Sequence, residues 1–330
     1  MSSAAACSVL SHILKGRSEG NSSTSLPPLK DMKTVIHTAR SIMKKEKTIL
    51  YLNGEYEVVG DVHGDLTSLM TIFEKRGYPN ITKYIFLGDY VDRGNDSIEV
   101  VLLLMALKCL APNRIYLIRG NHECSSVAKK YNFRDECVCR VDIPFFKTII
   151  KAFSVMPLGA VVNNDVFCVH GGIPQTDMTL QEISEVERPF NSDYKDIQED
   201  MLWSDPKTDL LFDEFEFNAA RKAGNYFGKK ALNSFFEKNG VSYLIRGHEV
   251  CQEGFELPLG SDCNCVTIFS SIDHQLRNLG ATITIGEDKS VSLCQFDNDN
   301  NDRIETVGFL DLTFKENNYC ISKDLTEISP

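Results

Sequence analysis

The sequence predicts an α/β fold, because short apolar segments with the character of strands alternate along the chain with amphipathic helical segments. Five of the apolar segments run directly into a tight turn that is rich in glycine and polar side chains. The chain has 330 residues, of which 42% are hydrophobic, and this is enough to bury the core of one large domain. We therefore expect one domain of catalytic size.

The N-terminal region predicts a flexible tail followed by a helix. Residues 16–30 concentrate glycine, serine, threonine and two prolines, so they cannot bury enough apolar area to offset the entropy of ordering. Apolar side chains recur at helical spacing between Met32 and Ile49. We expect residues 1–30 to form a flexible tail and residues 31–298 to form the folded domain.

Later segments carry signals for helix ends and for a C-terminal extension. Asp65 is placed to cap a helix that ends at Gly77, and Asp96 with Glu99 resembles a capping box. Residues 299–330 form a predicted extension, in which residues 307–314 and 319–321 flank a turn and favour a hairpin.

Charge and hydropathy exclude several classes of protein. The formal net charge is −11, which gives no electrostatic reason to bind a nucleic acid backbone. The longest apolar run, Val100 to Leu107, is shorter than the about 20 residues that span a bilayer. The N-terminus lacks the basic segment of a secretory signal, and the 11 cysteines include no CxxC pair. We expect a cytoplasmic or nuclear protein with reduced, mostly buried thiols.

The five polar turns carry the chemistry. In open α/β sheets, ligands bind beyond the carboxyl ends of the strands, so we expect the turns to converge on one edge. The blocks are GDVHGD (60–65), GDYVDRG (88–94), RGNHE (119–123), HGG (170–172) and RGHE (246–249).

The converging turns offer carboxylate, imidazole and amide side chains without a thiolate. Such ligands suit Mn, Fe or Zn better than a sulfur-bound structural zinc. More than four ligands exceed one tetrahedral site, so two divalent ions that share a carboxylate are expected. Two adjacent ions serve the hydrolysis of a phosphate ester. The expected ligands are Asp61, His63, Asp89, Asn121, His170 and His248.

Other interpretations of these residues are simpler. A lone histidine is more often packed or exposed than a ligand, which is how we interpret His12 and His37. The glycines of the turns can serve the turns alone, and Asp65 and Asp96 are expected to be helix caps. However, four of the seven histidines follow strands directly beside glycine and aspartate, which coincidence explains poorly.

The motifs resemble the metal-dependent phosphoprotein phosphatases, which include type-1, type-2A and calcineurin catalytic subunits. The five blocks occur in the order and spacing of that family, over roughly residues 35–297. LWSDP (202–206) and YNFRDEC (131–137), which is similar to the family's YGFYDEC, accompany them. The resemblance implies a calcineurin-like metallophosphoesterase fold, with a central β-sandwich of mixed sheets flanked by helices.

The resemblance also implies roles for single residues. Asp61, His63 and Asp89 would hold the first ion, with Asp89 bridging, and Asn121, His170 and His248 would complete the second. His122 would protonate the leaving serine or threonine oxygen and would be oriented by Asp92. Arg93 and Arg221 would clamp the phosphate. A hydroxide that bridges the ions would attack phosphorus directly, without a phosphoenzyme.

One loop departs from the family pattern. Residues 270–280 read SSIDHQLRNLG where the family has SAPNYC and a glycine-containing loop, and His274 stands where a tyrosine is expected. His274 is either a spectator or a titratable contact to the substrate.

The resemblance implies a serine/threonine protein phosphatase that acts on phosphoproteins together with a regulatory or targeting subunit. Two rivals remain: a small-molecule phosphoesterase similar to dinucleoside polyphosphate hydrolases, and a catalytically silent scaffold that binds phosphoproteins.

Overall fold

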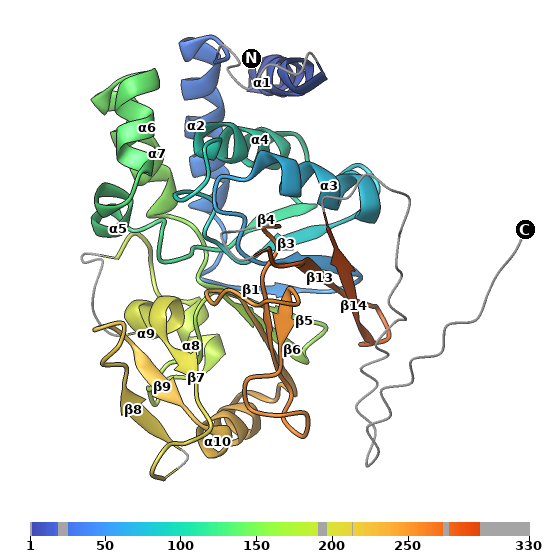
Figure 1. Cartoon of the computed structure of the whole chain (residues 1–330), viewed down its shortest axis with the longest axis vertical. Helices are drawn as coiled ribbons and strands as arrows, with labels where there is room; N and C mark the ends of the chain where they lie inside the picture. Colours follow the sequence, from blue (N-terminus) through green and yellow to red (C-terminus); the bar gives the residue numbers. More distant parts are fainter. Residues whose placement is uncertain (1, 19–25, 191–196, 213, 273–276, 298–330) are drawn as a thin grey trace, which may run out of the picture.

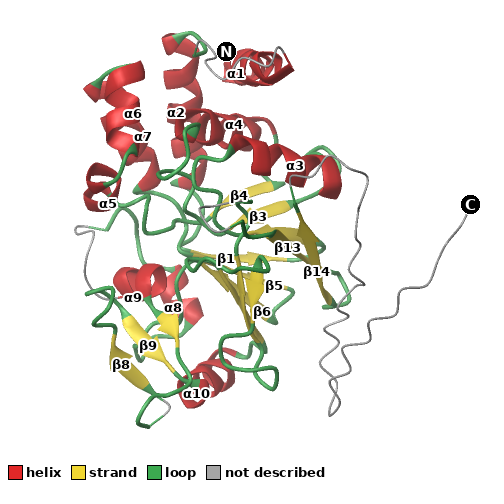
Figure 2. Ribbon diagram, in the orientation of Figure 1, coloured by secondary structure: helices red, strands yellow, loops and turns green. Residues whose placement is uncertain are grey.

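Two mixed β-sheets pack face to face, and helices cover their outer faces (Figure 1 and Figure 2). The computed structural model describes residues 2–18, 26–190, 197–212, 214–272 and 277–297. Among these residues, no helix is both long enough and apolar enough to cross a membrane.

The first sheet has five strands in the order β14-β13-β2-β3-β4. Strands β2, β3 and β4 run parallel, and the crossovers between them contain helices, whereas β13 is antiparallel to β2 and to β14. The strands are β2 (Tyr56–Val59), β3 (Tyr84–Phe86), β4 (Ile115–Leu117), β13 (Gly280–Ile285) and β14 (Val291–Phe296).

The second sheet has six strands in the order β1-β5-β6-β10-β12-β11, with β6, β10 and β12 parallel. These strands are β1 (Ile49–Leu52), β5 (Gly159–Val162), β6 (Val166–Val169), β10 (Tyr243–Arg246), β11 (Phe255–Glu256) and β12 (Cys265–Ile268). A smaller sheet has the order β7-β9-β8 and consists of β7 (Asp205–Pro206), β8 (Phe215–Phe217) and β9 (Asn225–Phe227).

The helices form two outer layers, one over each sheet (Figure 2). Those over the five-stranded sheet are α1 (Ser2–Ser18), α2 (Leu29–Met43), α3 (Leu66–Arg76), α4 (Ser97–Leu110), α6 (Phe133–Arg140) and α7 (Ile143–Phe153), with the short α5 (Ser125–Lys130) beside them. Those over the six-stranded sheet are α8 (Leu180–Ser184), α9 (Ile197–Trp203) and α10 (Lys229–Asn239).

Strand β6 shows how the sequence divides the core between layers. Its four residues are all buried, because both faces of the strand are covered. Val166 and Cys168 point into the core between the two sheets, whereas Phe167 and Val169 point toward the helices below. This two-sided burial explains why the strands before the polar turns are uniformly apolar.

The expected flexible tail over residues 1–30 is wrong for residues 2–18, which form α1. Ala5, Ala6, Val9 and Ile13 lie on one face of this helix and are buried against α2 and α4. The prediction rested on the polar composition of residues 16–30, whereas the helix is stabilised by packing of its apolar side chains against α2 and α4. Residues 19–25 lie outside the described part of the chain.

Other local expectations can be compared directly with the structure. The Asp65 carboxylate caps α3 by accepting from the N–H of Ser68, and α3 ends at Gly77 as expected. The expected capping box at α4 is absent, because Asp96 makes no capping hydrogen bond and Glu99 pairs with Arg140 at 2.9 Å. The helix expected from Met32 to Ile49 runs from Leu29 to Met43 and is followed by β1. The predicted C-terminal hairpin and His274 lie outside the described residues.

Candidate metal centre

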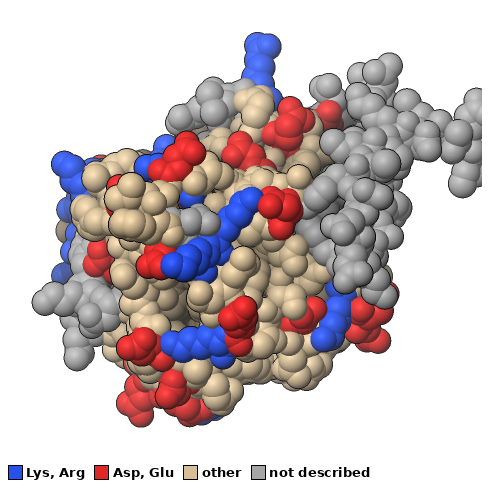
Figure 3. All heavy atoms as spheres, turned by 90° about the horizontal axis from the view of Figure 1, so that it is seen from below, with Lys and Arg blue, Asp and Glu red and all other residues tan. Residues whose placement is uncertain are grey.

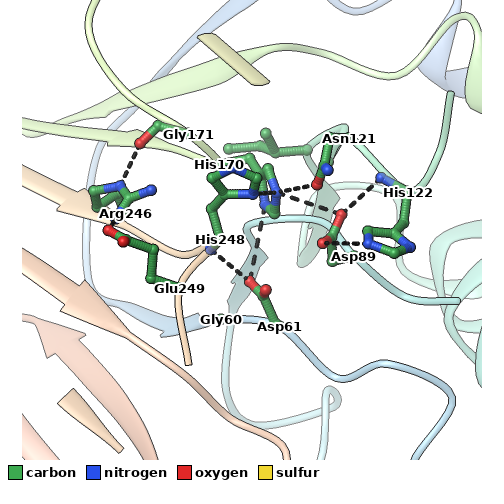
Figure 4. A network of polar contacts seen from close by, with 12 residues as sticks. Gly60, Asp61, Asp89, Asn121, His122, His170, Gly171, Arg246, His248 and Glu249 are labelled. Atoms are coloured by element: carbon green, nitrogen blue, oxygen red, sulfur yellow. Dashed lines mark hydrogen bonds and ion pairs between the residues drawn. The ribbon is translucent and has the colours of Figure 1, made fainter. Parts of the chain in front are cut away.

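All the predicted site residues that follow strands converge where the two sheets meet (Figure 4). The turns after β2, β3 and β4 bring residues from one sheet, and the turns after β6 and β10 bring His170 and His248 from the other. A parallel bridge between Asp61 and Phe269 joins the ends of the two sheets at this point. The carboxyl ends of the strands therefore form one site, as the sequence predicts.

The turns achieve this convergence with unusual backbone conformations. Five non-glycine residues of the site have positive φ, which costs free energy unless the surroundings hold the turn in place. They are His63 (φ 47°), Asp89 (53°), Asp92 (68°), Arg93 (68°) and His248 (74°). The strained residues thus lie in the turns that directly follow β2, β3 and β10.

Two glycines of the motifs are required by close approach to the carboxylates. A Cβ atom on Gly120 would lie 2.3 Å from Oδ1 of Asp89, and one on Gly247 would lie 2.5 Å from Oδ1 of Asp61. Any side chain at these positions would displace a carboxylate from the centre.

The first group of donor atoms surrounds His63. Its Nε2 lies 3.6 Å from Oδ2 of Asp61 and 3.6 Å from Oδ2 of Asp89. Its Nδ1 lies 3.0 Å from the carbonyl of Val91, which is the partner that a protonated Nδ1 needs. Donation from Nδ1 leaves the lone pair of Nε2 directed at the carboxylates, which is how proteins orient a histidine ligand.

The second group surrounds His170. Its Nε2 lies 2.9 Å from Oδ1 of Asn121, 3.2 Å from Nδ1 of His248 and 3.4 Å from Oδ1 of Asp89. Asp89 therefore contributes one oxygen to each group, which is the arrangement expected of a bridging carboxylate. His122 also lies within reach of the first group, with Nε2 3.8 Å from Oδ2 of Asp89.

The donor set fits a pair of cations. Oδ1 of Asn121 points at atoms that are themselves hydrogen-bond acceptors, while the opposite amide orientation would let its nitrogen donate to Asp89 at 3.0 Å. A cation between these atoms favours the orientation that is present, because it binds the amide oxygen. Nε2 of His170 and Nδ1 of His248 are the ring nitrogens that face Asn121 in this group, and they lie 3.2 Å from each other. These residues thus offer oxygen and nitrogen lone pairs for two divalent ions.

Burial shifts the protonation of these groups. Burial raises the pKa of Asp61 to about 7, and burial with the charges of Asp61 and Glu123 raises the pKa of Asp89 well above its ordinary value. Burial and neighbouring positive charge lower the pKa values of His170 and His248 well below the ordinary value. Neutral imidazole is the ligand form, and bound cations would favour the ionised carboxylates.

Glu123 holds the backbone of the turn that carries Asp89. Its carboxylate accepts from the N–H groups of Asp89 at 2.8 Å, Tyr90 at 2.9 Å and Gly120 at 2.9 Å. Asp89 in turn accepts from the N–H of His122 at 2.9 Å, and Asp61 accepts from the N–H of His248 at 2.9 Å. This network fixes the positions of the carboxylates before any ligand binds.

The expected proton donor and its partner are adjacent. Nδ1 of His122 lies 2.7 Å from Oδ2 of Asp92, and the other Asp92 oxygen accepts from the N–H of Phe133 at 2.7 Å. The ring of Tyr131 lies beside the His122 ring, with 4.8 Å between the centroids. Burial raises the pKa of Asp92 to about 7, opposed by the Phe133 hydrogen bond and by Arg93.

The two expected phosphate clamps differ in how they are held. Arg93 is exposed, and its guanidinium carbon lies 5.4 Å from the centre of the Tyr131 ring. Arg221 lies between β8 and β9, and its Nε donates to Oδ2 of Asp205 at 2.7 Å. Nη2 of Arg221 lies 3.3 Å from Oδ1 of the same carboxylate, so Asp205 anchors the whole guanidinium.

Sequence reasoning missed the roles of Asp205, Arg246 and Glu123. Nε of Arg246 donates to the carbonyl of Gly171 (Figure 4). Its Nη2 donates to Asp205 at 2.9 Å, so one buried arginine joins the RGHE, HGG and LWSDP blocks. The signal was present, because both arginine and aspartate belong to the motif blocks. Their pairing across 41 residues was not readable from spacing.

The fold and the paired donor groups define a metallophosphoesterase. Residues 58–252, more than half of the chain, match the calcineurin-like phosphoesterase family, and the chain belongs to that family. This result confirms the fold class predicted from the sequence.

Two solved structures illustrate the similarity. A serine/threonine phosphatase from Saccharomyces cerevisiae with similarity to human phosphatase PP5 is 27% identical, with a TM-score of 0.76 over 82% of this chain and 90% of that chain. A cold-active protein-tyrosine phosphatase from a psychrophilic Shewanella species is 17% identical, with a TM-score of 0.55 over 78% of this chain and 82% of that chain. The second likeness shows the fold alone.

Proposed function

We propose that this protein is a serine/threonine protein phosphatase with a dinuclear metal centre. The observation that carries the proposal is the buried His122–Asp92 pair, which lies next to the two donor groups around Asp89. The similarity of this chain to the yeast serine/threonine phosphatase, over most of both chains, supports a phosphoserine or phosphothreonine substrate.

In this proposal, Asp61, His63 and Asp89 would hold one ion, and Asp89, Asn121, His170 and His248 would hold the other. The ions, when bound, supply Lewis-acid activation of a water nucleophile and neutralise charge on the phosphate. Mn, Fe and Zn all suit this donor set.

The remaining steps belong to the side chains. The guanidinium groups of Arg93 and Arg221 bind and orient the phosphate oxygens. Asp92 accepts from Nδ1 of His122, which fixes the orientation of the ring and leaves Nε2 to hold the proton. That proton passes to the leaving serine or threonine oxygen.

The surface charge argues against a nucleic acid substrate. Seen from below, lysine and arginine side chains lie next to aspartate and glutamate side chains and do not gather into a basic stripe on that face (Figure 3). With the net charge of −11, this pattern offers no footprint for a nucleic acid backbone.

The test is hydrolysis of a phosphothreonine peptide by the full chain, with and without manganese. Asp89→Asn serves as the inactive variant, and a dinucleoside polyphosphate serves as the competing substrate. Manganese-dependent peptide turnover that is lost in Asp89→Asn supports the proposal. Turnover of the dinucleotide without turnover of the peptide would favour a small-molecule phosphoesterase, and two bound ions without any turnover would favour a silent binding protein.

A further inference from the structure

Three consecutive residues, 131–133, contact the turn that carries Asp92 and Arg93. The N–H of Phe133 donates to the Asp92 carboxylate at 2.7 Å, and the ring of Tyr131 lies under the Arg93 guanidinium. Between them, Oδ1 of Asn132 accepts from the N–H of Arg93 at 2.6 Å. Nδ2 of the same side chain donates to the carbonyl of Gly94 at 3.0 Å. The Asn132 side-chain amide thus binds both the N–H of Arg93 and the carbonyl of Gly94.

The turn needs such support because its backbone is strained. Asp92 and Arg93 both have φ of 68°, and two successive non-glycine residues in the left-handed region are unfavourable. A Cβ on Gly94 would lie 2.4 Å from the His63 carbonyl, so the turn is packed tightly on that side. Asn132 holds the opposite, exposed side of the turn.

Arg93 also lacks the anchor that Arg221 has. The Arg221 guanidinium is bound by Asp205, whereas in the described part of the chain the Arg93 guanidinium forms no ion pair and contacts the Tyr131 ring. The direction of the Arg93 side chain therefore depends on its backbone and on the Tyr131 ring, and Asn132 is the side chain that accepts from the Arg93 N–H. The related family pattern YGFYDEC has a glycine at this place, so the amide clamp is a property of this chain's YNFRDEC block.

We propose that Asn132 is a positioning residue that fixes Arg93 for phosphate binding. This inference rests on the proposed role of Arg93 in holding the phosphate. It requires no particular leaving group, so it applies to any phosphate monoester that the centre accepts.

The test measures phosphate binding and turnover in Asn132→Ala. The manganese-loaded full chain is titrated with inorganic phosphate by calorimetry, and kcat/KM is measured with p-nitrophenyl phosphate. Loss of two hydrogen bonds predicts roughly tenfold weaker phosphate binding and a similar loss of kcat/KM. Arg134→Ala is the matched control, because Arg134 belongs to the same segment and pairs with Asp135. It should match the wild type in both measurements.

The decisive arm repeats the substitution in an Arg93→Ala background. If Asn132 acts through the guanidinium, Asn132→Ala there changes phosphate affinity by less than about twofold. An equal, additive loss in that background, or unchanged phosphate affinity in the single variant, would overturn the inference. Calorimetry reports on Asn132 even where a phosphothreonine peptide is not hydrolysed, so failure of the protein phosphatase proposal and failure of this one are distinguishable.

Discussion

Nδ1 of His122 and Oδ2 of Asp92 lie 2.7 Å apart, and both side chains are buried at the edge of the candidate metal centre. The Asp92 carboxylate fixes the tautomer of the His122 ring, because Nδ1 donates its proton to it. Nε2 of the ring then faces the candidate centre. Because Nε2 also lies 3.8 Å from Asp89, the same imidazole is placed either to donate a proton or to bind an ion.

Substitution of His122 separates these two roles. We expect His122→Asn to lower turnover of a phosphothreonine peptide by roughly a hundredfold to ten-thousandfold, because the leaving oxygen loses its proton donor. Metal content should stay at the wild-type level, and p-nitrophenyl phosphate should lose less turnover because its leaving group needs no proton. Near-normal peptide turnover, or loss of one ion, would argue against the role of His122 as the acid.

Asp89 links both donor groups, so its substitution should affect both ions. We expect Asp89→Asn to retain less than half of the metal bound by the wild type after gel filtration, measured by elemental analysis. Manganese at about 100 times its dissociation constant should stabilise the wild type by about 2.7 kcal/mol and the variant by much less. Asp288→Asn, on an exposed loop far along the chain, is the control. Equal manganese stabilisation of Asp89→Asn and wild type would contradict a bridging role.

Asp205 is expected to be both a structural and a functional anchor. Its carboxylate accepts from Arg221 and from the buried Arg246, so Asp205→Ala leaves a buried guanidinium without one of its partners. We expect a loss of about 3 kcal/mol in the free energy of unfolding by urea, together with weaker phosphate binding. Asp262→Ala removes the exposed partner of Lys229 and should leave both quantities unchanged. Unchanged stability of Asp205→Ala would show that Glu249 and Thr267 suffice to hold Arg246.

Glu136 gives a prediction for pH. Burial raises the pKa of Glu136 to about 7 from the ordinary 4.5, although the N–H of Ile98 donates to its carboxylate. A carboxyl group with a raised pKa in the folded state stabilises the fold fully below pH 4.5, and that stability is lost as pH rises through 7. Glu136→Gln cannot ionise, so between pH 4.5 and 8 it should gain about 3 kcal/mol relative to the wild type in urea unfolding. A difference that does not change with pH would show that Glu136 is ionised in the folded state.

Packing of α1 predicts a contrast between two neighbouring residues. Ile13 is 3% exposed and faces α4 and α2, whereas Leu14 is 40% exposed. Ile13→Ala should lower the free energy of unfolding by about 2–4 kcal/mol, and Leu14→Ala by less than about 1 kcal/mol. Thermal or urea unfolding checks both, and equal effects would mean that α1 does not pack as described.

The sequence predicted the convergence of the polar turns better than it predicted the N-terminal helix. Each polar block follows a short buried strand directly, so knowing the strand was enough to place His63, Asp89 and His170 at carboxyl ends of strands. The sequence did not reveal that these ends belong to two sheets, with His63 and Asp89 on one and His170 on the other. The buried face of α1 consists of two alanines, one valine and one isoleucine, and so short an apolar stripe gives little periodic signal. Its stability comes from the apolar surface of α4, which no local pattern reveals.

Pairings between distant blocks were likewise hidden. Asn132 lies within a recognised block, but its contact is with Arg93, which lies 39 residues earlier in the chain. That contact depends on the conformation of the turn that carries Arg93. Asp205 and Arg246 each stood in a motif, and only the packing of the small sheet against the larger one brings them together. Sequence spacing predicts which edge a residue reaches, whereas side-chain partners across that edge depend on how the layers pack.

The centre draws His63 and Asp89 from one sheet and His170 and His248 from the other, with the apolar core formed by Val58, Ile245 and Ile283 between them. The packing of that core therefore sets the distance between the two halves of the candidate centre. Metal affinity should therefore depend on how well the two sheets pack against each other. A conservative substitution in the core, such as Ile283→Val, should lower the metal affinity measurably even where the free energy of unfolding changes little.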